Sequence, residues 1–110
     1  PRAPAIIGVW PFVSDLRTGA MSGGPPEQGI LSAACAQVGQ HLDLPTGTGC
    51  GMSDAKLPDF QGGAEHASNV AVAALSGANI IYESAGMYAS LLSACPESLL
   101  MDNDVLGACM

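Results

Sequence analysis

Gly51-Met52-Ser53-Asp54-Ala55-Lys56-Leu57-Pro58-Asp59 is the stretch of sequence from which the organisation of this chain can be read. It places the only lysine between two aspartates, in a chain whose charged residues amount to 12%. A glycine-rich segment comes before it, and a segment with helical spacing comes after it. Loops that join a strand to a helix often carry the chemistry of α/β proteins, because a rigid sheet aims their side chains. We therefore interpret it as a functional loop, with a plain solvated loop as the alternative.

The same order of apolar run, charged exit and helical segment recurs along the chain. Short apolar runs bounded by turn residues predict strands, and longer amphipathic segments predict helices. The predicted strands are residues 5–12, 44–52, 79–83 and 98–101, and the predicted helices are residues 25–42, 60–77 and 86–95. Strands that alternate with helices favour a parallel sheet. The sequence therefore predicts an α/β fold with parallel strands and crossover helices.

Two of the predicted helices have an apolar face. In the first it consists of Ile30, Leu31, Ala34, Cys35, Val38 and Leu42, and in the second of Ala64, Ala67, Val70, Ala71, Ala74 and Leu75. Helical spacing puts each set on one side of its helix, so we expect both faces to be buried. We also expect Asp59 to cap the second helix and Ser76-Gly77 to end it.

The charged residues cluster after the predicted strands. Eight of the thirteen charged residues follow an apolar run: Asp15, Arg17, Asp54, Lys56, Asp59, Glu83, Asp102 and Asp104. In a parallel βα array these positions share the face at the carboxyl ends of the strands, which is the active-site face of β/α barrels. The alternative is that helix N-termini attract acidic residues through their positive dipole end.

The composition excludes some classes of partner. The net charge of −7 argues against nucleic acid and against anionic membranes, because both attract basic surfaces. No apolar run approaches the roughly 18 residues of a membrane span. The four cysteines lack CxxC spacing, and we expect reduced thiols in a cytoplasmic protein. The chain begins at Pro1 rather than at a methionine, so we expect it to be a piece of a longer protein.

Several segments resemble one known family, in the right order and at the right intervals over almost the whole chain. They are WPFVSDLRTGAMSGG (10–24), EQGILSAACAQ (27–37), SDAKLPD (53–59), YESAGMYASLL (82–92) and ESLLMDNDVLG (97–107). The resemblance is to the trimethylamine methyltransferases, a family that includes glycine betaine methyltransferases. It implies a partial (β/α)8 barrel of the TIM type, with three βα units and one further strand. Residues 1–110 would then be a fragment of a single catalytic domain, from the C-terminal half of the barrel.

The resemblance also implies an activity. The complete enzyme would move a methyl group from a tertiary or quaternary amine to the reduced cobalt of a corrinoid carried by a separate protein. Some members of the family contain pyrrolysine, whereas this sequence contains only standard residues, which favours the glycine betaine branch. The expected partners are the methylated amine and the corrinoid protein. The open strand edges of a partial barrel also favour self-association into a homo-oligomer.

A methylammonium centre would be held by carboxylates and aromatic faces. We expect Glu83, Asp102 and Asp104 to be the catalytic anions. The expected substrate-binding residues are Trp10, Asp15, Arg17, Asp54, Lys56, Tyr82 and Tyr88. No resident metal is expected, since a zinc site from Cys35, Cys50, His41 and His66 lacks ligand spacing.

Other interpretations remain open at this point. His41 and His66 fall on predicted helices and are not expected to be catalytic. Trp10 is as well explained by burial in a packed core, and the alternative for Tyr82 is that its hydroxyl anchors a strand end. Phosphate binding is disfavoured, because the predicted face offers two basic groups against six acids. A non-catalytic βα module that serves only in assembly is the main alternative to the enzyme.

Overall fold

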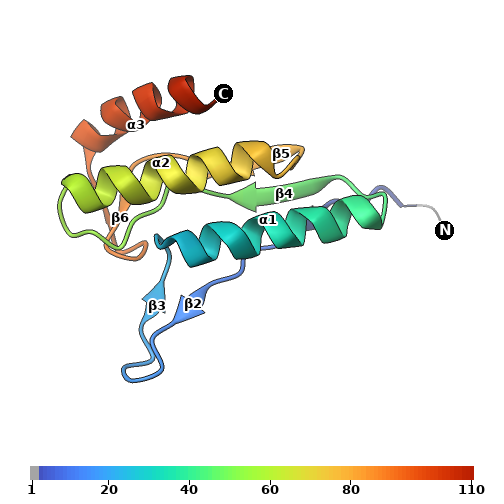
Figure 1. Ribbon diagram of the computed structural model, residues 1–110, viewed down its shortest axis with the longest axis horizontal. Coiled ribbons are helices and arrows are strands. Elements are labelled where there is room, and N and C mark those ends of the chain that lie inside the picture. The colour runs from blue at the N-terminus through green and yellow to red at the C-terminus, as the bar shows by residue number, and fades with distance from the viewer. Residues whose placement is uncertain (1–2) are drawn as a thin grey trace.

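The computed structural model describes residues 3–110 and contains helices and strands in mixed order (Figure 1). The helices are α1 (Pro26–His41), α2 (Phe60–Leu75) and α3 (Pro96–Cys109). The strands are β1 (Ile7–Gly8), β2 (Val13–Ser14), β3 (Met21–Ser22), β4 (Thr46–Gly49), β5 (Ile80–Tyr82), β6 (Met87–Tyr88) and β7 (Ser93–Ala94). No helix within the described residues has the length and apolar character needed to cross a membrane.

The centre of the fold is a three-stranded parallel sheet in the order β1-β4-β5. Strand β1 pairs with β4 through Ile7 opposite Thr46, and β5 pairs with β4 through Ile81 opposite Thr48. Helix α1 connects β1 to β4, and helix α2 connects β4 to β5. The predicted parallel sheet with crossover helices is therefore confirmed for its first three strands.

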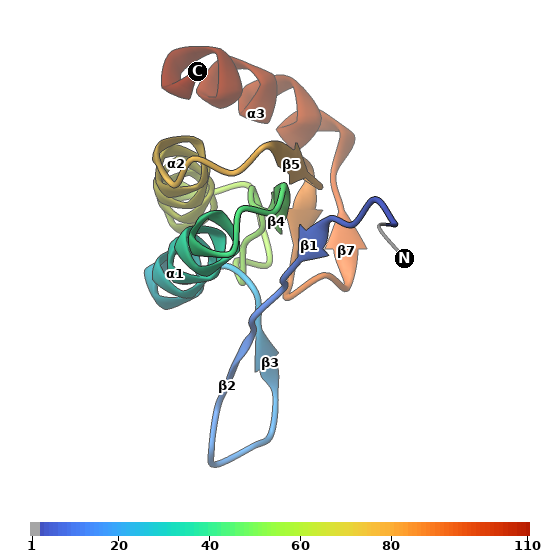
Figure 2. The same ribbon diagram turned by 90° about the vertical axis from the view of Figure 1, so that its right-hand side faces the viewer.

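The helices cover one face of this sheet. Figure 2 shows α1 and α2 on the same side of β4, and α3 lies beyond α2, which it contacts. Pro26 occupies the first turn of α1, where a missing backbone N–H does no harm. The side chain of Asp59 accepts a hydrogen bond from Gly62 N at 3.0 Å, so its predicted role as the cap of α2 is confirmed.

Two predicted elements are wrong. Residues 86–95 form the hairpin β6–β7 instead of a helix. Its turn contains Ala89, Ser90 and Leu91 with φ of 51°, 55° and 72°, which a right-handed helix cannot contain. Residues 98–101 belong to α3 instead of a strand. Pro96 and Glu97 are start signals of that helix, and the apolar run that suggested a strand lies largely exposed on it.

A second hairpin was not predicted. Strands β2 and β3 pair antiparallel through Val13 opposite Ser22, and Figure 1 shows their hairpin projecting from the helices and the parallel sheet. Its turn is closed by the backbone hydrogen bond from Gly19 N to Asp15 O at 2.7 Å, with Gly19 at φ 71°. The segment that follows β1 therefore leaves the sheet before it returns to start α1.

The buried helix faces differ from the predicted ones. On α1 the buried residues are small or polar, and the predicted apolar face is largely exposed: Ile30, Leu31, Ala34, Val38 and Leu42. The buried face of α2 is Gly62, His66, Asn69, Val70 and Ala73, whereas Ala64 and Leu75 are exposed. Asn69 fills the space beside Gly29 and donates to Gly24 O at 2.7 Å. The two helices thus approach closely through glycines and hydrogen bonds instead of large apolar side chains.

The exposed face of α1 borders an open apolar hollow. This hollow has a volume of about 330 Å³ and is lined by Ile7, Val9, Leu31, Ala34, Cys35 and Val38. A small apolar core lies on the other side of α2, where Cys50, Val70 and Ala73 pack with residues of β5 and α3. The apolar surface of the chain is therefore divided between a closed core and an uncovered face.

Strand β4 alternates threonine and glycine, and its two faces differ accordingly. Thr46 lies against Gly39 of α1, so Gly47 and Gly49 face away from the helices. The ring of Tyr82 crosses Gly47, where an added Cβ would lie 2.8 Å from Cε1, and its hydroxyl lies over Gly8. The indole of Trp10 covers Gly49 at even closer range. These glycines allow two aromatic rings to lie directly on the sheet.

A side chain added at Gly49 should therefore disturb the sheet. We expect Gly49→Ala to lower the free energy of unfolding by about 1–3 kcal/mol, because the new methyl group would displace the Trp10 indole. The matched control is Gly63→Ala on α2, where nothing lies within 4 Å of the added methyl. That change should stabilise the helix by about 0.5–1 kcal/mol. Thermal unfolding of the two variants checks this, and equal shifts of Tm would contradict the packing described.

Candidate functional site

An aromatic pair marks the carboxyl ends of the parallel strands. The rings of Trp10 and Tyr82 meet edge to face with their centroids 5.7 Å apart, and Phe12 packs against Trp10 at 5.5 Å. The Nε1 atom of Trp10 is buried without a hydrogen-bond partner among the described residues. Both rings lie on the face of the sheet that the helices leave uncovered. Of the predicted site residues, Trp10 and Tyr82 are brought into contact.

Glu83 follows Tyr82 directly and is exposed. Its backbone has φ 57°, a left-handed conformation that is uncommon for a residue with a side chain. Within residues 3–110, no hydrogen bond engages its carboxylate, in contrast to those of Asp54 and Asp102. Glu83 is therefore the acid at the strand ends whose charge is free to meet a ligand.

Asp54 is a structural crosslink. Its carboxylate accepts hydrogen bonds from Ser22 Oγ, from Gly23 N at 2.9 Å, from Gly24 N at 3.3 Å and from Ser90 Oγ at 2.8 Å. Burial acts to raise the pKa of Asp54, but these donors outweigh it and the pKa is lowered. The carboxylate thus joins β3, the start of α1 and the β6–β7 turn, which leaves it little capacity to bind a substrate.

Glu65 supports the same loop and was missed by the sequence analysis. It accepts hydrogen bonds from Ser53 Oγ at 2.7 Å and from the backbone N of Asp54 at 2.8 Å. Lys56 is exposed, and its Nζ donates to the backbone carbonyl of Asp54 at 2.7 Å instead of to the carboxylate. The opening stretch of the sequence is therefore a tightly held loop, and only Lys56 of its predicted site residues projects into solvent.

A buried pair connects α2 to α3. His66 Nδ1 lies 2.5 Å from Asp102 Oδ1, and His66 Nε2 lies 3.1 Å from the carbonyl oxygen of Met87. The second oxygen of Asp102 accepts from Gly86 N at 2.7 Å. Both side chains are essentially inaccessible to solvent, with relative exposures of 1% and 6%. The sequence predicts that His66 lies on a helix and is not catalytic. It does not reveal the contact with Asp102, because the two residues are 36 positions apart.

Tyr88 belongs to the same buried cluster. Its ring centroid lies 4.9 Å from that of His66, and it packs against Gly62 at the start of α2. Burial, followed by the negative charge of Asp102, raises the pKa of the Tyr88 hydroxyl. Because Tyr88 is 3% exposed, its predicted contact with substrate would require this cluster to open.

The remaining predicted residues lie apart from the aromatic pair. Asp15 and Arg17 form an ion pair of 3.2 Å in the turn of the β2–β3 hairpin, and the hydrogen bond from Arg17 lowers the pKa of Asp15. Asp104 lies exposed on α3. The prediction that Asp102 and Asp104 follow a strand is wrong, because their segment is helical. The eight charged residues therefore do not form one acidic face.

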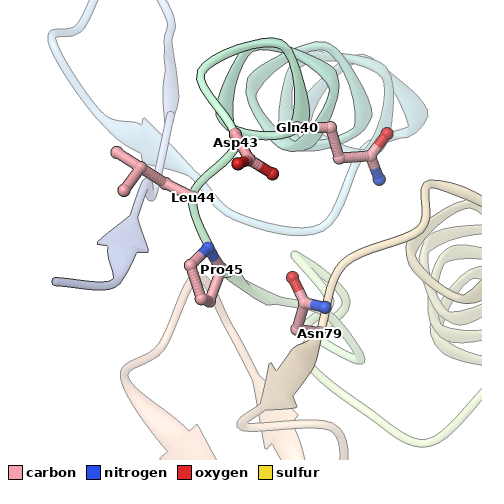
Figure 3. Close-up of a pocket in the computed structure, with 5 residues that line it drawn as sticks. All are labelled: Gln40, Asp43, Leu44, Pro45 and Asn79. Carbon is pink, nitrogen blue, oxygen red and sulfur yellow. The ribbon is translucent and has the colours of Figure 1, made fainter. Parts of the chain in front are cut away.

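Another hollow lies at the opposite edge of the sheet. It measures about 510 Å³ and is lined by Gln40, Asp43, Leu44, Pro45 and Asn79 (Figure 3). Pro45 and Asn79 precede β4 and β5, so this is the amino-terminal edge of the strands. The amide of Gln40 donates to Ser76 O and Gly77 O, and Asn79 Oδ1 accepts from Thr46 N. Gln40 thus holds the residues that follow α2, and Asn79 holds the start of β4.

The four cysteines form no disulfide and no metal site among the described residues. Cys35, Cys50, Cys95 and Cys109 are all free, and Cys50 is buried. No group of three histidine, cysteine, aspartate or glutamate side chains within residues 3–110 could hold a metal ion. Burial raises the pKa of the Cys50 thiol, which disfavours its nucleophilic thiolate form.

Parallel strands, one-sided helices and an aromatic pair at the strand ends define the chain as part of an α/β protein built from βα units. The sequence profile of the family described as "Trimethylamine methyltransferase (MTTB)" matches residues 1–110. This chain belongs to that family.

Individual relatives agree with this assignment. The chain is 43% identical over 107 residues to a trimethylamine methyltransferase MttB of Methanosarcina barkeri, and 32% identical over 107 residues to a glycine betaine methyltransferase of Desulfitobacterium hafniense. A trimethylamine methyltransferase MttB of Desulfitobacterium hafniense is 33% identical over 103 residues. These matches cover 94–97% of this chain but only 21–22% of the relatives. The chain thus spans about a fifth of their length.

Because Asp54 crosslinks three segments through its charged carboxylate, we expect the stability of the fold to depend on pH. The folded state holds the pKa of Asp54 below its ordinary value of 3.8, so the carboxylate stabilises the fold above that pH. This stability is lost as the pH falls through the lowered pKa. We expect Asp54→Asn to reduce the free energy of unfolding by about 1–2 kcal/mol at pH 7, because an amide oxygen accepts fewer and weaker hydrogen bonds.

Denaturant unfolding at several pH values provides the measurement. The difference between wild type and Asp54→Asn should shrink towards zero in strong acid. The exposed Asp104→Asn serves as control and should stay within about 0.5 kcal/mol of wild type. If the loss of free energy of unfolding in Asp54→Asn were independent of pH, the charge of the carboxylate would not be its cause.

Proposed function

We propose that this chain is part of the catalytic domain of a methyltransferase that acts on a tertiary or quaternary amine. The methyl group passes to the reduced cobalt of a corrinoid carried by a separate protein. In this step the N–CH₃ bond breaks and its electron pair stays on the amine, while the cobalt supplies the pair for the new bond. The names of the relatives, trimethylamine and glycine betaine methyltransferases, support the amine as substrate.

We also propose that the chain forms part of the wall of a (β/α)8 barrel. Two observations support this. The strands β1, β4 and β5 are adjacent and parallel, and their helices follow on one face, whereas a doubly wound sheet has helices on both faces. The apolar hollow between β1 and α1 would then be covered by the neighbouring βα unit of the longer protein. In a barrel, the face bearing Trp10 and Tyr82 points to the interior.

The single observation that carries the proposed site is the aromatic pair on the open face, followed by a free carboxylate. A methylated ammonium ion has a diffuse positive charge and few or no hydrogens to donate, so aromatic faces and carboxylates are its natural partners. Trp10 and Tyr82 provide the faces and Glu83 the charge. Trp10 and Tyr82 pack on Gly49 and Gly47 of β4, and this packing makes them a rigid surface for the ion.

In this proposal the chain binds and orients the amine, and the corrinoid supplies the nucleophilic cobalt when its carrier protein docks. The residues described here are assigned no role in holding the cobalt. Asp54 and Asp102 keep the loops around the strand ends in place. Lys56 is exposed, and its ammonium has further hydrogens beyond the one donated to Asp54 O, so it could also meet a carboxylate on a betaine-like substrate.

A non-catalytic assembly module is the second candidate. It is favoured by the uncovered apolar face of α1, which includes Ile30 and Val38 with exposures of 64% and 57%. The two candidates differ in what the open face of the sheet does. An assembly module has no need for a free carboxylate that directly follows one of two paired aromatic residues.

Substitution of Glu83 tests the proposed function. In the full-length protein we expect Glu83→Gln to reduce kcat/KM for the methylated amine by about ten- to a hundredfold, because a carboxylate near a partly desolvated cation contributes about 1–3 kcal/mol. Glu97→Gln is the control, since Glu97 lies exposed in the first turn of α3. The measurement is methyl transfer to a reduced corrinoid protein. Full activity of a folded Glu83→Gln variant would remove this carboxylate from the mechanism.

A further inference from the structure

The segment that carries Glu83 is held at both of its ends. Its upstream neighbour Tyr82 is fixed in the sheet, where it pairs with Gly49. Downstream, Gly86 N donates to Asp102, and the carbonyl of Met87 accepts from His66 and from the backbone N of Ser53. Only Glu83, Ser84 and Ala85 lie between these fixed points. The short span means that the backbone of Glu83 has little freedom to move.

The conformation of Glu83 requires such restraint. A non-glycine residue at φ 57° is strained, and strain of this kind persists only where the surroundings enforce it. Ser84 packs against the backbone of Gly51, so residue 84 cannot shift towards β4 to relieve the strain. Loss of the Gly86 hydrogen bond would extend the unrestrained span to residues 83–86, because Met87 is still bonded to Ser53 N. Glu83 could then return to an ordinary conformation and change the direction of its side chain.

The hydrogen bonds of His66 show how the restraint works. The carbonyl of Met87 can only accept, so Nε2 of His66 carries a hydrogen. A second hydrogen lies between Nδ1 and Asp102 Oδ1, and the other oxygen of Asp102 receives the N–H of Gly86. Every polar atom of the pair thus has a partner. The imidazole is further fixed by the ring of Tyr88.

We propose that His66 and Asp102 are positioning residues that hold Glu83 in place for the methylated ammonium substrate. This proposal rests on the function proposed above. The pair acts through the backbone of Gly86 and Met87 and does not touch the substrate. This assignment replaces the direct catalytic role that the sequence suggested for Asp102.

The variants Asp102→Asn and Asp102→Ala separate the two roles. An asparagine can donate from Nδ2 to a neutral His66 Nδ1 and accept from Gly86 N, so every hydrogen bond of the pair survives without the charge. If Asp102 positions Glu83, Asp102→Asn keeps kcat/KM within about threefold of wild type, whereas Asp102→Ala loses on the order of ten- to a hundredfold. A catalytic carboxylate predicts the large loss for both variants. Asn103→Ala, at the exposed next position on α3, is the control.

A double-mutant cycle then tests whether Asp102 acts through Glu83. If it does, Asp102→Ala causes no further loss when added to Glu83→Gln, whereas independent effects multiply. Hydrogen exchange of residues 83–88 in the full-length protein, measured by mass spectrometry without substrate, should be faster in Asp102→Ala than in Asp102→Asn. Exchange in the hairpin of residues 13–22 should stay unchanged.

The outcomes are distinguishable. Unchanged exchange in Asp102→Ala, additive losses in the cycle, or loss of activity in Asp102→Asn would each overturn the positioning role. Full activity of Glu83→Gln would instead overturn the proposed function, and the exchange measurement would still decide whether the pair holds the segment. If Asp102→Ala does not fold, His66→Ala replaces it, because it removes the donor for the Met87 carbonyl and leaves Asp102 without its imidazole. The same increase in exchange is expected for that variant.

Discussion

The close approach of side chains to the backbone of β4 is the constraint on which this structure depends. Thr46 faces α1 and approaches Gly39, while Gly47 and Gly49 on the other face accept the rings of Tyr82 and Trp10. A side chain at either glycine would lift a ring off the sheet. The four residues of β4 are all buried, although their own apolar content is small. The strand therefore serves as a thin spacer between a layer of helices and a pair of aromatic rings.

Polar contacts hold together much of the interior of the chain. Asp54 and the His66–Asp102 pair each join segments more than 30 positions apart in the sequence. Buried polar groups of this kind stabilise a structure only when every partner is present, so they define loop positions sharply. The large apolar side chains of α1 remain exposed instead. This distribution fits a chain whose apolar faces meet further segments of a longer protein.

The sequence was informative where structure is local. Parallel strands around residues 7, 47 and 81, the helices 26–41 and 60–75 and the Asp59 cap followed from apolar runs and capping signals. The sequence was misleading where contacts between residues far apart in the chain determine the local structure. The apolar run Ser98–Met101 suggests a strand unless Pro96 and Glu97 are recognised as the start of a helix. Residues 86–95 form a hairpin because the backbones of Met87 and Ser90 hydrogen-bond to the loop after β4. The partner of His66 could not be found, since no local pattern connects it to Asp102.

The central claim is that the open face of the sheet binds a methylated cation through aromatic rings and a carboxylate. Calorimetric titration of the full-length protein tests it directly. The two ligands to compare are glycine betaine and 3,3-dimethylbutanoate, in which an uncharged carbon replaces the quaternary nitrogen. Choline and 3,3-dimethylbutan-1-ol form a second such pair. We predict that a cation binds at least about tenfold more tightly than its isostere and that Trp10→Leu abolishes this preference. Equal binding of cation and isostere in both pairs, or a preference unchanged in Trp10→Leu, would contradict the account.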